Sequence, residues 1–441
     1  MQHDVLLDYE LAVTQDNYIV RALVKLTGQL PDNGARTPLN LSLVLDRSGS
    51  MSGEKLAAAR SAAAFLVRRL RPEDVVSVVA YDDQVQTVAM PATGDSQQQL
   101  PREIERIESG GSTNLSGGWL RGRELVGEGK DDHKMNRVIL MTDGLANEGI
   151  QDPDTLARLC ADAKKQGVTT TTIGFGSDYD ERLLRKMADA GGGSTFYIER
   201  EDQAIGVFEE EIEGLLTLSA QNVAVEIKPA DAVQLVAIHH DYPLTEVGNG
   251  VKRVELGDLY AREPRSLLVE FLVPALGEGN AVSIAKIVIH AHVLMASGGI
   301  ERQRITLPIV GPLDAEGRRD PEVQREVVLS QAARARREAR EMSDAGDIES
   351  ARRILREARV RLSQHPEQTP LVMENAEDLR VMERTIEHAD AYDRKYMEQR
   401  AYNMSRGKAA YEQKLSRFNN PGKPPKPPEL ARRVRPPKPP K

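Results

Sequence analysis

Residues 41–51 read Leu-Ser-Leu-Val-Leu-Asp-Arg-Ser-Gly-Ser-Met, an apolar run that ends in a cluster of oxygen-bearing side chains. Asp46, Ser48 and Ser50 stand at alternate positions, directly after a predicted buried strand and before a segment that favours a helix. A carboxylate and two hydroxyls are hard oxygen ligands, which suit Mg²⁺ or a similar small divalent cation. The same residue types are common in turns and helix caps, so Ser50 or Ser52 could instead cap the helix that follows.

Two later segments offer further ligands for such a cation. Residues 110–114, Gly-Gly-Ser-Thr-Asn, carry the hydroxyl of Thr113 on a flexible turn, and residues 137–144 form a second apolar strand that leads into Asp143. In an open parallel α/β sheet, ligands collect outside the carboxyl ends of the strands. We therefore expect three loops, far apart in the sequence, to converge on one cation.

Taken together, the Asp-x-Ser-x-Ser motif, Thr113 and Asp143 resemble the complete metal-ion-dependent adhesion site of a von Willebrand factor A (VWA) domain, over roughly residues 39–217. The resemblance implies an α/β doubly wound, Rossmann-like domain. It also implies that Ser48, Ser50 and Thr113 touch the metal directly, while Asp46 and Asp143 act largely through waters. Mg²⁺ is the implied cofactor, with Mn²⁺ or Ca²⁺ as alternatives, and one open coordination position would take an acidic group from a partner.

The remainder of residues 39–217 alternates between strand and helix patterns, as a doubly wound sheet requires. Trp119 lies in a predicted helix after the Thr113 loop, either in the core or on the rim of the metal site. The expected elements are a helix over 56–70, a strand over 75–81, an antiparallel edge strand over 85–90, a helix near 154–166, a strand over 168–174, a helix near 180–189, a strand over 194–198 and a helix over 202–217.

Other chemistries fit the sequence less well. Residues 49–55 are rich in glycine and end in lysine, but they lack the spacing of a phosphate-binding loop. There is no Gly-x-Ser-x-Gly motif, and no histidine lies near the first strand to activate a serine. Cys160 is expected to be a buried apolar residue of an amphipathic helix. His290 and His292 share a strand face, but no third zinc ligand is evident.

The segments on either side of the predicted VWA domain are rich in strand patterns. Short β-branched runs separated by turn residues fill 219–310, which indicates an antiparallel sandwich. The strands within Leu6–Leu26 have no partner before the VWA domain begins, so we expect segments 1–38 and 218–312 to form one sandwich into which the VWA domain is inserted. This layout resembles that of intracellular bacterial VWA proteins and of inter-alpha-trypsin-inhibitor-like chains.

Residues 318–418 change to helical periodicity. Gly346 and Asp347 predict a helix end and a new N-cap, followed by an apolar stripe through Leu355 and Leu362. The hairpin is similar to a tetratricopeptide unit, and further helices near 371–389 and 391–417 would complete a small bundle or docking arm.

The last segment, 419–441, contains nine prolines and should be a disordered, polyproline-II-like tail. Its charge is +7 − 1 = +6, which leaves −8 − 6 = −14 on the rest of the chain. The tail could be a solubilising spacer, a contact for acidic or anionic surfaces, or a Pro-x-x-Pro ligand for a second partner.

The function that these patterns favour is a non-enzymatic, metal-dependent scaffold for protein–protein interaction, which binds a Glu or Asp of its partner through the metal. The alternatives are a metal-dependent phosphoester hydrolase that uses Arg47, Asp82 and Asp83, and an accessory subunit of an AAA+ ATPase machine. Nucleic acid is not the expected partner. With one cysteine, no signal-like first residues and no run long enough to span a membrane, we expect a cytoplasmic protein.

Overall fold

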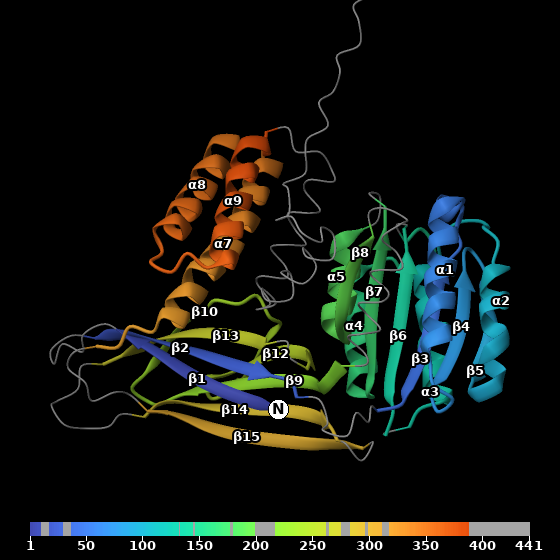
Figure 1. Ribbon diagram of the computed structural model, residues 1–441, viewed down its shortest axis with the longest axis horizontal. Coiled ribbons are helices and arrows are strands. Elements are labelled where there is room, and N and C mark those ends of the chain that lie inside the picture. Colours follow the sequence, from blue (N-terminus) through green and yellow to red (C-terminus); the bar gives the residue numbers. More distant parts are fainter. Residues whose placement is uncertain are drawn as a thin grey trace, which may run out of the picture.

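The computed structural model describes residues 1–9, 17–29, 37–131, 133–143, 146–176, 180–198, 217–261, 264–274, 283–295, 299–310 and 317–387. Three bodies make up this part of the chain: an α/β domain, a pair of antiparallel sheets and a bundle of helices (Figure 1). The predicted helix over 391–417 and the predicted tail over 419–441 lie outside the described residues. So does nearly all of the predicted helix over 202–217.

The α/β domain is built on a six-stranded sheet in the order β5-β4-β3-β6-β7-β8. Neighbouring strands are parallel except for β4 and β5, so the predicted antiparallel edge is confirmed. The central strands are buried along their whole length, as expected when helices cover both faces of a parallel sheet. The strands are β3 (Leu39–Asp46), β4 (Val75–Tyr81), β5 (Val85–Ala92), β6 (Met135–Thr142), β7 (Val168–Phe175) and β8 (Gly192–Ile198).

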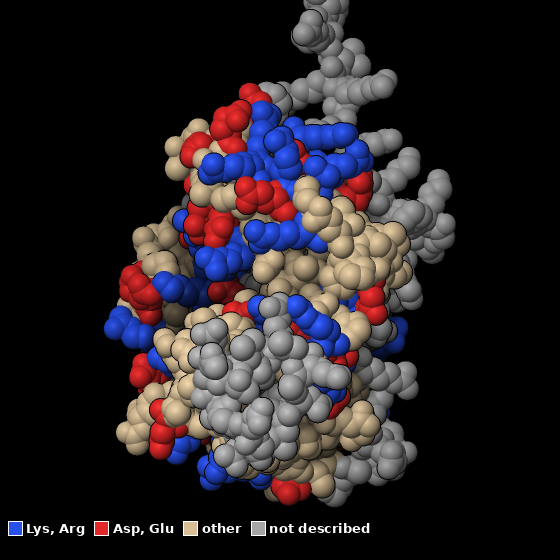
Figure 2. Space-filling view, turned by 90° about the vertical axis from the view of Figure 1, so that its left-hand side faces the viewer, with Lys and Arg blue, Asp and Glu red and all other residues tan. Residues whose placement is uncertain are grey.

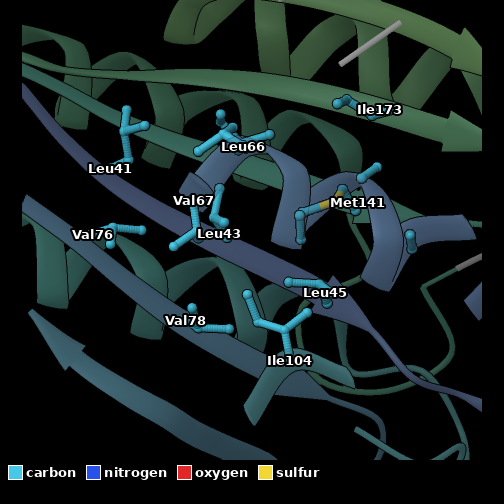
Figure 3. Close-up of a cluster of buried hydrophobic side chains, with 14 of the residues drawn as sticks. Leu41, Leu43, Leu45, Leu66, Val67, Val76, Val78, Ile104, Met141 and Ile173 are labelled. Atoms are coloured by element: carbon cyan, nitrogen blue, oxygen red, sulfur yellow. The ribbon is translucent and has the colours of Figure 1, made fainter. Parts of the chain in front are cut away.

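Helices cover the two faces of this sheet unequally. Helices α1 (Glu54–Arg69) and α2 (Leu100–Glu105) pack on one face through aliphatic side chains such as Leu66, Val67 and Ile104 (Figure 3). Helices α3 (Leu115–Glu128), α4 (Pro153–Lys165) and α5 (Glu181–Gly191) cover the other. Short 3₁₀ turns, η1 (Gly49–Met51) and η2 (Gly94–Gln99), precede α1 and α2.

Trp119 belongs to the core of the α/β domain and not to the rim of the metal site. The indole is fully buried among the side chains of α3, α4 and the sheet, and its Nε1 donates to Thr170 Oγ1 at 3.2 Å. Cys160 is buried in the same cluster, as its amphipathic helix predicts.

The antiparallel body consists of two sheets that share one apolar core. Strand β2 pairs with β13 from Thr27↔Pro264 to Tyr18↔Val273, so residues from before and after the α/β domain form one sheet. The first sheet holds β1 (Gln2–Tyr9), β2 (Tyr18–Thr27), β13 (Pro264–Val273) and β10 (Gln234–Ile238), in that order. The second holds β11 (Leu244–Gly248), β12 (Val251–Tyr260), β9 (Leu218–Pro229), β14 (Ser283–Leu294) and β15 (Ile300–Val310).

The C-terminal helices are α7 (Pro321–Asp344), α8 (Ile348–Gln364) and α9 (Pro370–Thr385). The predicted turn between α7 and α8 is confirmed: Gly346 has a φ of 85°, and the side chain of Asp347 accepts from Ser350 N. The predicted apolar stripe, which includes Leu355 and Leu362, faces the interior of the bundle. None of the described helices combines the length and the apolar character needed to cross a membrane.

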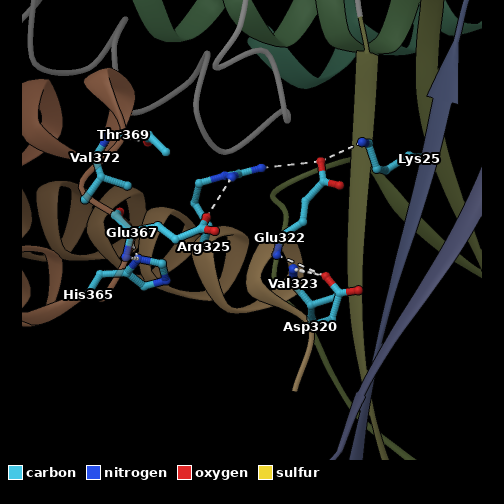
Figure 4. A network of polar contacts seen from close by, with 9 residues as sticks. All are labelled: Lys25, Asp320, Glu322, Val323, Arg325, His365, Glu367, Thr369 and Val372. Carbon is cyan, nitrogen blue, oxygen red and sulfur yellow. Dashed lines mark hydrogen bonds and ion pairs between the residues drawn. The ribbon is translucent and has the colours of Figure 1, made fainter. Parts of the chain in front are cut away.

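Helix α7 joins the bundle to both other bodies. At its start, Glu322 accepts from Lys25 of β2 at 2.5 Å, and Arg325 lies within ion-pair distance of Glu322 (Figure 4). Near its end, Arg340 Nη2 donates to Oε1 of Glu181, the first residue of α5, at 3.0 Å. The bundle is therefore held against the α/β domain as well as against the sandwich.

Candidate metal centre

Asp46 ends β3 and ties two of the predicted loops together. Its side chain is buried; Oδ1 accepts from Ser48 N at 2.8 Å, and Oδ2 accepts from Thr142 Oγ1 at 2.5 Å. Because Thr142 is the last residue of β6, this carboxylate fixes the loop after β3 to the end of the neighbouring strand.

The hydroxyls of the Asp-x-Ser-x-Ser motif face the second carboxylate. Ser50 Oγ donates to Asp143 Oδ1 at 2.7 Å and lies 3.2 Å from Ser48 Oγ. Asp143 is buried, whereas Ser50 is exposed, so the cluster opens to solvent on the side of η1. The other oxygen of Asp143 accepts from the ammonium group of Lys55, in the first turn of α1.

The loop that carries Thr113 lies against the same cluster. Gly110 N donates to Arg47 O at 2.7 Å, and Gly49 N donates to Gly111 O at 2.9 Å. Thr113 itself is buried, and its carbonyl accepts from two backbone N–H groups of the loop after Asp143, at 3.0 and 3.1 Å. The structure thus brings together the three loops that the sequence predicts to converge.

Asp82, at the end of β4, holds the Thr113 loop in place. It accepts from Arg47 Nη2 at 3.2 Å, from Gly111 N at 3.2 Å and from Gln84 N at 2.9 Å. Burial opposes ionisation of Asp82, but these hydrogen bonds and the Arg47 guanidinium hold its pKa below its usual range. A Cβ at position 110 would overlap the Asp82 carboxylate, which explains the glycine there.

The buried carboxylates leave the site short of positive charge. Burial raises the pKa of Asp46, and the nearby Asp143 raises it further, against the hydrogen bonds from Thr142 and Ser48. With both carboxylates ionised, the charge is −2, and Lys55 brings it to −2 + 1 = −1. Arg47 does not change this balance, because its guanidinium is engaged with Asp82. A further cation would be favoured here on electrostatic grounds.

Among the described residues, no group of three or more His, Cys, Asp or Glu side chains is placed to hold a metal. A metal at this centre would therefore depend on the serine and threonine hydroxyls. The alternative in which Ser50 or Ser52 caps α1 is wrong, because the N-cap is Gly53 and no side chain caps it.

Sequence reasoning missed the contact of Lys55 and the role of Thr142. Lys55 carried a signal, since a cation in the first turn of a helix opposes the helix dipole and is stabilised by a nearby anion. For a hydrolase, Arg47 and Asp82 would have to face the metal with free side chains. Instead, the two side chains bind each other and organise the loops.

His290, considered as a zinc ligand, and Cys160, considered as a nucleophile, do not belong to the candidate metal centre. His290 Nε2 lies 3.2 Å from Glu226 Oε2, and in the described part of the chain it belongs to no group of three His, Cys, Asp or Glu side chains that could hold a metal. Burial raises the pKa of Cys160 to about 12, so its thiol is not a nucleophile at neutral pH.

The α/β domain, with this sheet order and these three converging loops, matches the family model of the von Willebrand factor type A domain over residues 40–211. An uncharacterized protein of Synechocystis sp. is 29% identical over 267 residues, which cover 59% of this chain and 63% of that protein. Inter-alpha-trypsin inhibitor heavy chain H3 of Homo sapiens is 28% identical over 192 residues, covering 41% of this chain and 22% of the relative. The chain thus spans less than two thirds of the length of these relatives.

A solved structure, the von Willebrand factor type A protein from Catenulispora acidiphila, has a similar fold over most of the chain. It superposes with a TM-score of 0.70 at 19% identity and covers 92% of this chain and 96% of its own. The ArnB paralog VWA2 from Sulfolobus acidocaldarius gives a TM-score of 0.58 at 17% identity, with 92% and 98% covered. At these identities the similarity concerns the fold alone.

Proposed function

We propose that the chain is a non-enzymatic interaction protein that binds an acidic side chain of a partner protein through a divalent cation. The cation would be held by Ser48, Ser50 and Thr113, with Asp46 and Asp143 behind them. The observation that carries this proposal is the spacing of oxygens from two loops, with Ser50 Oγ 3.2 Å from Ser48 Oγ and 2.7 Å from Asp143 Oδ1.

The distance between the two serine oxygens is compatible with neighbouring ligands of one octahedral cation. Mg²⁺ binds oxygen at 2.0–2.1 Å, so adjacent ligands of an octahedron lie about 2.9 Å apart, whereas the longer bonds of Ca²⁺ would place them roughly 3.3–3.7 Å apart. Hydrogen bonds alone can also produce such distances, but the net charge of the cluster favours a cation as well. The 3.2 Å between the two serine oxygens lies between these values, so we propose Mg²⁺, or Mn²⁺ with its similar preference for six oxygens, from the hard oxygen donor set, with Ca²⁺ as the alternative.

The donor set also favours a carboxylate as the group that a partner supplies. Neutral hydroxyls neutralise little of the charge of a divalent ion, so the ion would attract an anionic ligand at its open position. The exposed Gly49 and Ser50 leave that side of the centre accessible to a partner. Since Asp82 and Arg47 are occupied with each other, they do not offer a general base or a phosphate-binding cation to a hydrolase.

The first test compares Ser50→Ala with Ser52→Ala. Ser50 is exposed, and its loss removes one hydroxyl ligand and the hydrogen bond to Asp143 Oδ1, while Lys55 still pairs with the other oxygen of that carboxylate; Ser52 is an exposed serine of the same loop. Titration of the full chain with MgCl₂ in a calorimeter should give saturable binding for the wild type and for Ser52→Ala. Ser50→Ala should bind at least about tenfold more weakly, a loss of about 1.4 kcal/mol. Equal affinity of the two variants would contradict the proposed ligands.

The second test concerns the partner. Proteins captured on the immobilised wild type in MgCl₂ should be released by EDTA and should not be retained by Ser50→Ala. Retention that is the same with EDTA, or the same on Ser50→Ala, would show that the metal centre does not hold the partner. We further propose that the helices within 318–418 and the tail at 419–441 serve a second partner, which deletion of each segment would test.

A further inference from the structure

The outer face of the five-stranded sheet gathers cations on β9, β14 and β15. Alternate residues of these strands, among them Ile227, Ile287 and Ile305, point into the sandwich core. The residues between them therefore lie on the opposite face. These include four exposed cationic residues: Lys228, Lys286, Arg302 and Arg304. Figure 1 shows β14 and β15 on the side of the sandwich away from helices α7 to α9.

The strand register places each of the four cations directly opposite another basic residue. Lys286 pairs with Lys228, Arg304 with His290, and Arg302 with His292. Burial lowers the pKa of His292, and the positive charge of Arg302 lowers it further. Lys228 and Lys286 are like charges in directly opposed positions, which destabilise a sheet, so this pair has a cost that the fold alone does not explain.

Little negative charge compensates these residues. On the same face Glu226 is engaged by Arg253 at 2.9 Å and by His290 at 3.2 Å, and Glu255 is engaged by Arg253 and Lys164. Within the described ranges, the four exposed cations have no acidic partner. The whole chain has a net charge of −8, so this face runs against the overall balance.

Protection of a sheet edge explains only part of this pattern. Charged residues on an edge strand prevent sheets from pairing with one another, and β15 is an edge strand. Lys228 and Lys286 lie on β9 and β14, which have neighbours on both sides. Edge protection therefore accounts for Arg302 and Arg304 but not for the lysine pair.

We propose that this cationic face, defined by Lys228, Lys286, Arg302 and Arg304, binds an extended acidic segment of a partner polypeptide. Arg302 and Arg304 are two residues apart on one strand, which corresponds to about 6.6–6.8 Å. Asp or Glu residues at alternate positions of an extended segment repeat at the same interval. A segment laid along β15 would thus place successive carboxylates opposite successive arginines.

The chemistry of the face favours a polypeptide over the other polyanions. Binding of single-stranded nucleic acid relies on aromatic side chains that stack on bases, and membrane-surface binding relies on inserted apolar side chains. Between the cations, the outward-facing residues are Glu226, Thr306, Pro308 and the buried Ala224 and Val288, along with the histidines. A face of this kind offers charge and hydrogen bonds but neither stacking nor insertion.

The test uses a fluorescein-labelled peptide of alternating Glu and Thr residues, as long as β15, and the full chain in EDTA. EDTA removes any contribution of the metal centre, so this experiment succeeds or fails independently of the proposed function. The double variant Arg302→Glu with Arg304→Glu reverses two charges of the face. Its matched control is Arg353→Glu with Arg361→Glu on α8, where exposed Arg and Glu residues intermingle over the bundle (Figure 2).

We expect the peptide to bind the wild type and the α8 control with the same affinity. Its affinity for the Arg302/Arg304 variant should be lower by a factor of about ten or more. Added salt should weaken the binding, because exposed charges are screened within about 8 Å at physiological ionic strength. An equal loss in both double variants, or no binding to the wild type, would overturn the proposal. Binding of phosphatidylserine vesicles or of an oligonucleotide in place of the peptide would overturn the assignment to a polypeptide.

Discussion

Replacing a glycine of helix α3 by alanine should lower the free energy of unfolding at Gly118 and raise it at Gly127. A Cβ on Gly118 would lie 2.5 Å from Cγ of Tyr81, whose ring is fully buried between α3 and the sheet. A Cβ on Gly127 would meet nothing within 4 Å. Each Gly→Ala change gains about 1 kcal/mol of helix propensity. At Gly118 this gain is opposed by overpacking, which costs about 1–3 kcal/mol and here lies at the upper end because the aromatic ring cannot move aside.

The expected result is a net loss of about 2 kcal/mol in the free energy of unfolding for Gly118→Ala and a gain of up to about 1 kcal/mol for Gly127→Ala. Guanidinium unfolding of the full chain, followed by tryptophan fluorescence, measures both. Trp119 is the single tryptophan and is buried in the α/β core, so its signal isolates the unfolding of this domain. If Gly118→Ala were as stable as the wild type, the reasoning from close packing would be refuted.

Two further predictions concern other parts of the molecule. The His239 imidazole, 3.3 Å from the Glu270 carboxylate, and the hydrogen bond from Arg21 lower the pKa of Glu270 to about 2 despite its burial, so this carboxylate stabilises the fold above its unfolded pKa of 4.5. That stabilisation should be lost as the pH falls from 4.5 toward 2. The stability difference between the wild type and Glu270→Gln, measured by urea unfolding at several pH values, should shrink over that range; a constant difference would contradict it. Cys160, buried and with a raised pKa, should not react with a thiol reagent in the native chain at pH 7 but should react fully in guanidinium. Rapid native labelling would show instead that the thiol is accessible.

Much of the α/β domain could be predicted from the sequence because its strands are continuous apolar runs. The strand predicted over 75–81 coincides with β4, and the one over 168–174 differs from β7 by a single residue. Such runs are buried on both faces of a parallel sheet, so their composition alone distinguishes them from loops.

The individual strands of the β11–β12 hairpin, which turns at Gly248-Asn249-Gly250, could not be predicted from the sequence. Strand β11 is exposed along its whole length, and the pairing of β12 with β9 is interrupted by register shifts near Gly257. Neither strand shows a regular alternation of apolar and polar residues, because their pairing partners and not their own patterns hold them in place.

The loops of the candidate site could be predicted because strand ends locate them, but the contacts within them could not. The contact of Lys55 with Asp143 depends on where α1 begins and on the direction of a long side chain. The position of Trp119 depends on which face of α3 meets the sheet. The Lys55 contact and the position of Trp119 both depend on how helices pack against the sheet. The hydrophobic periodicity within one helix or strand does not reveal that packing.

The pairing of β2 with β13 has a consequence for how the chain folds during synthesis. The strands of the α/β domain lie within one continuous stretch, Leu39 to Ile198, so this domain can fold as soon as that stretch has left the ribosome. Strand β2 is made earlier but must wait for β13, because Thr27 pairs with Pro264. Until then the hairpin of β1 and β2 exposes an apolar face and an unpaired edge, so during synthesis this hairpin is open to association with other chains and to binding by chaperones.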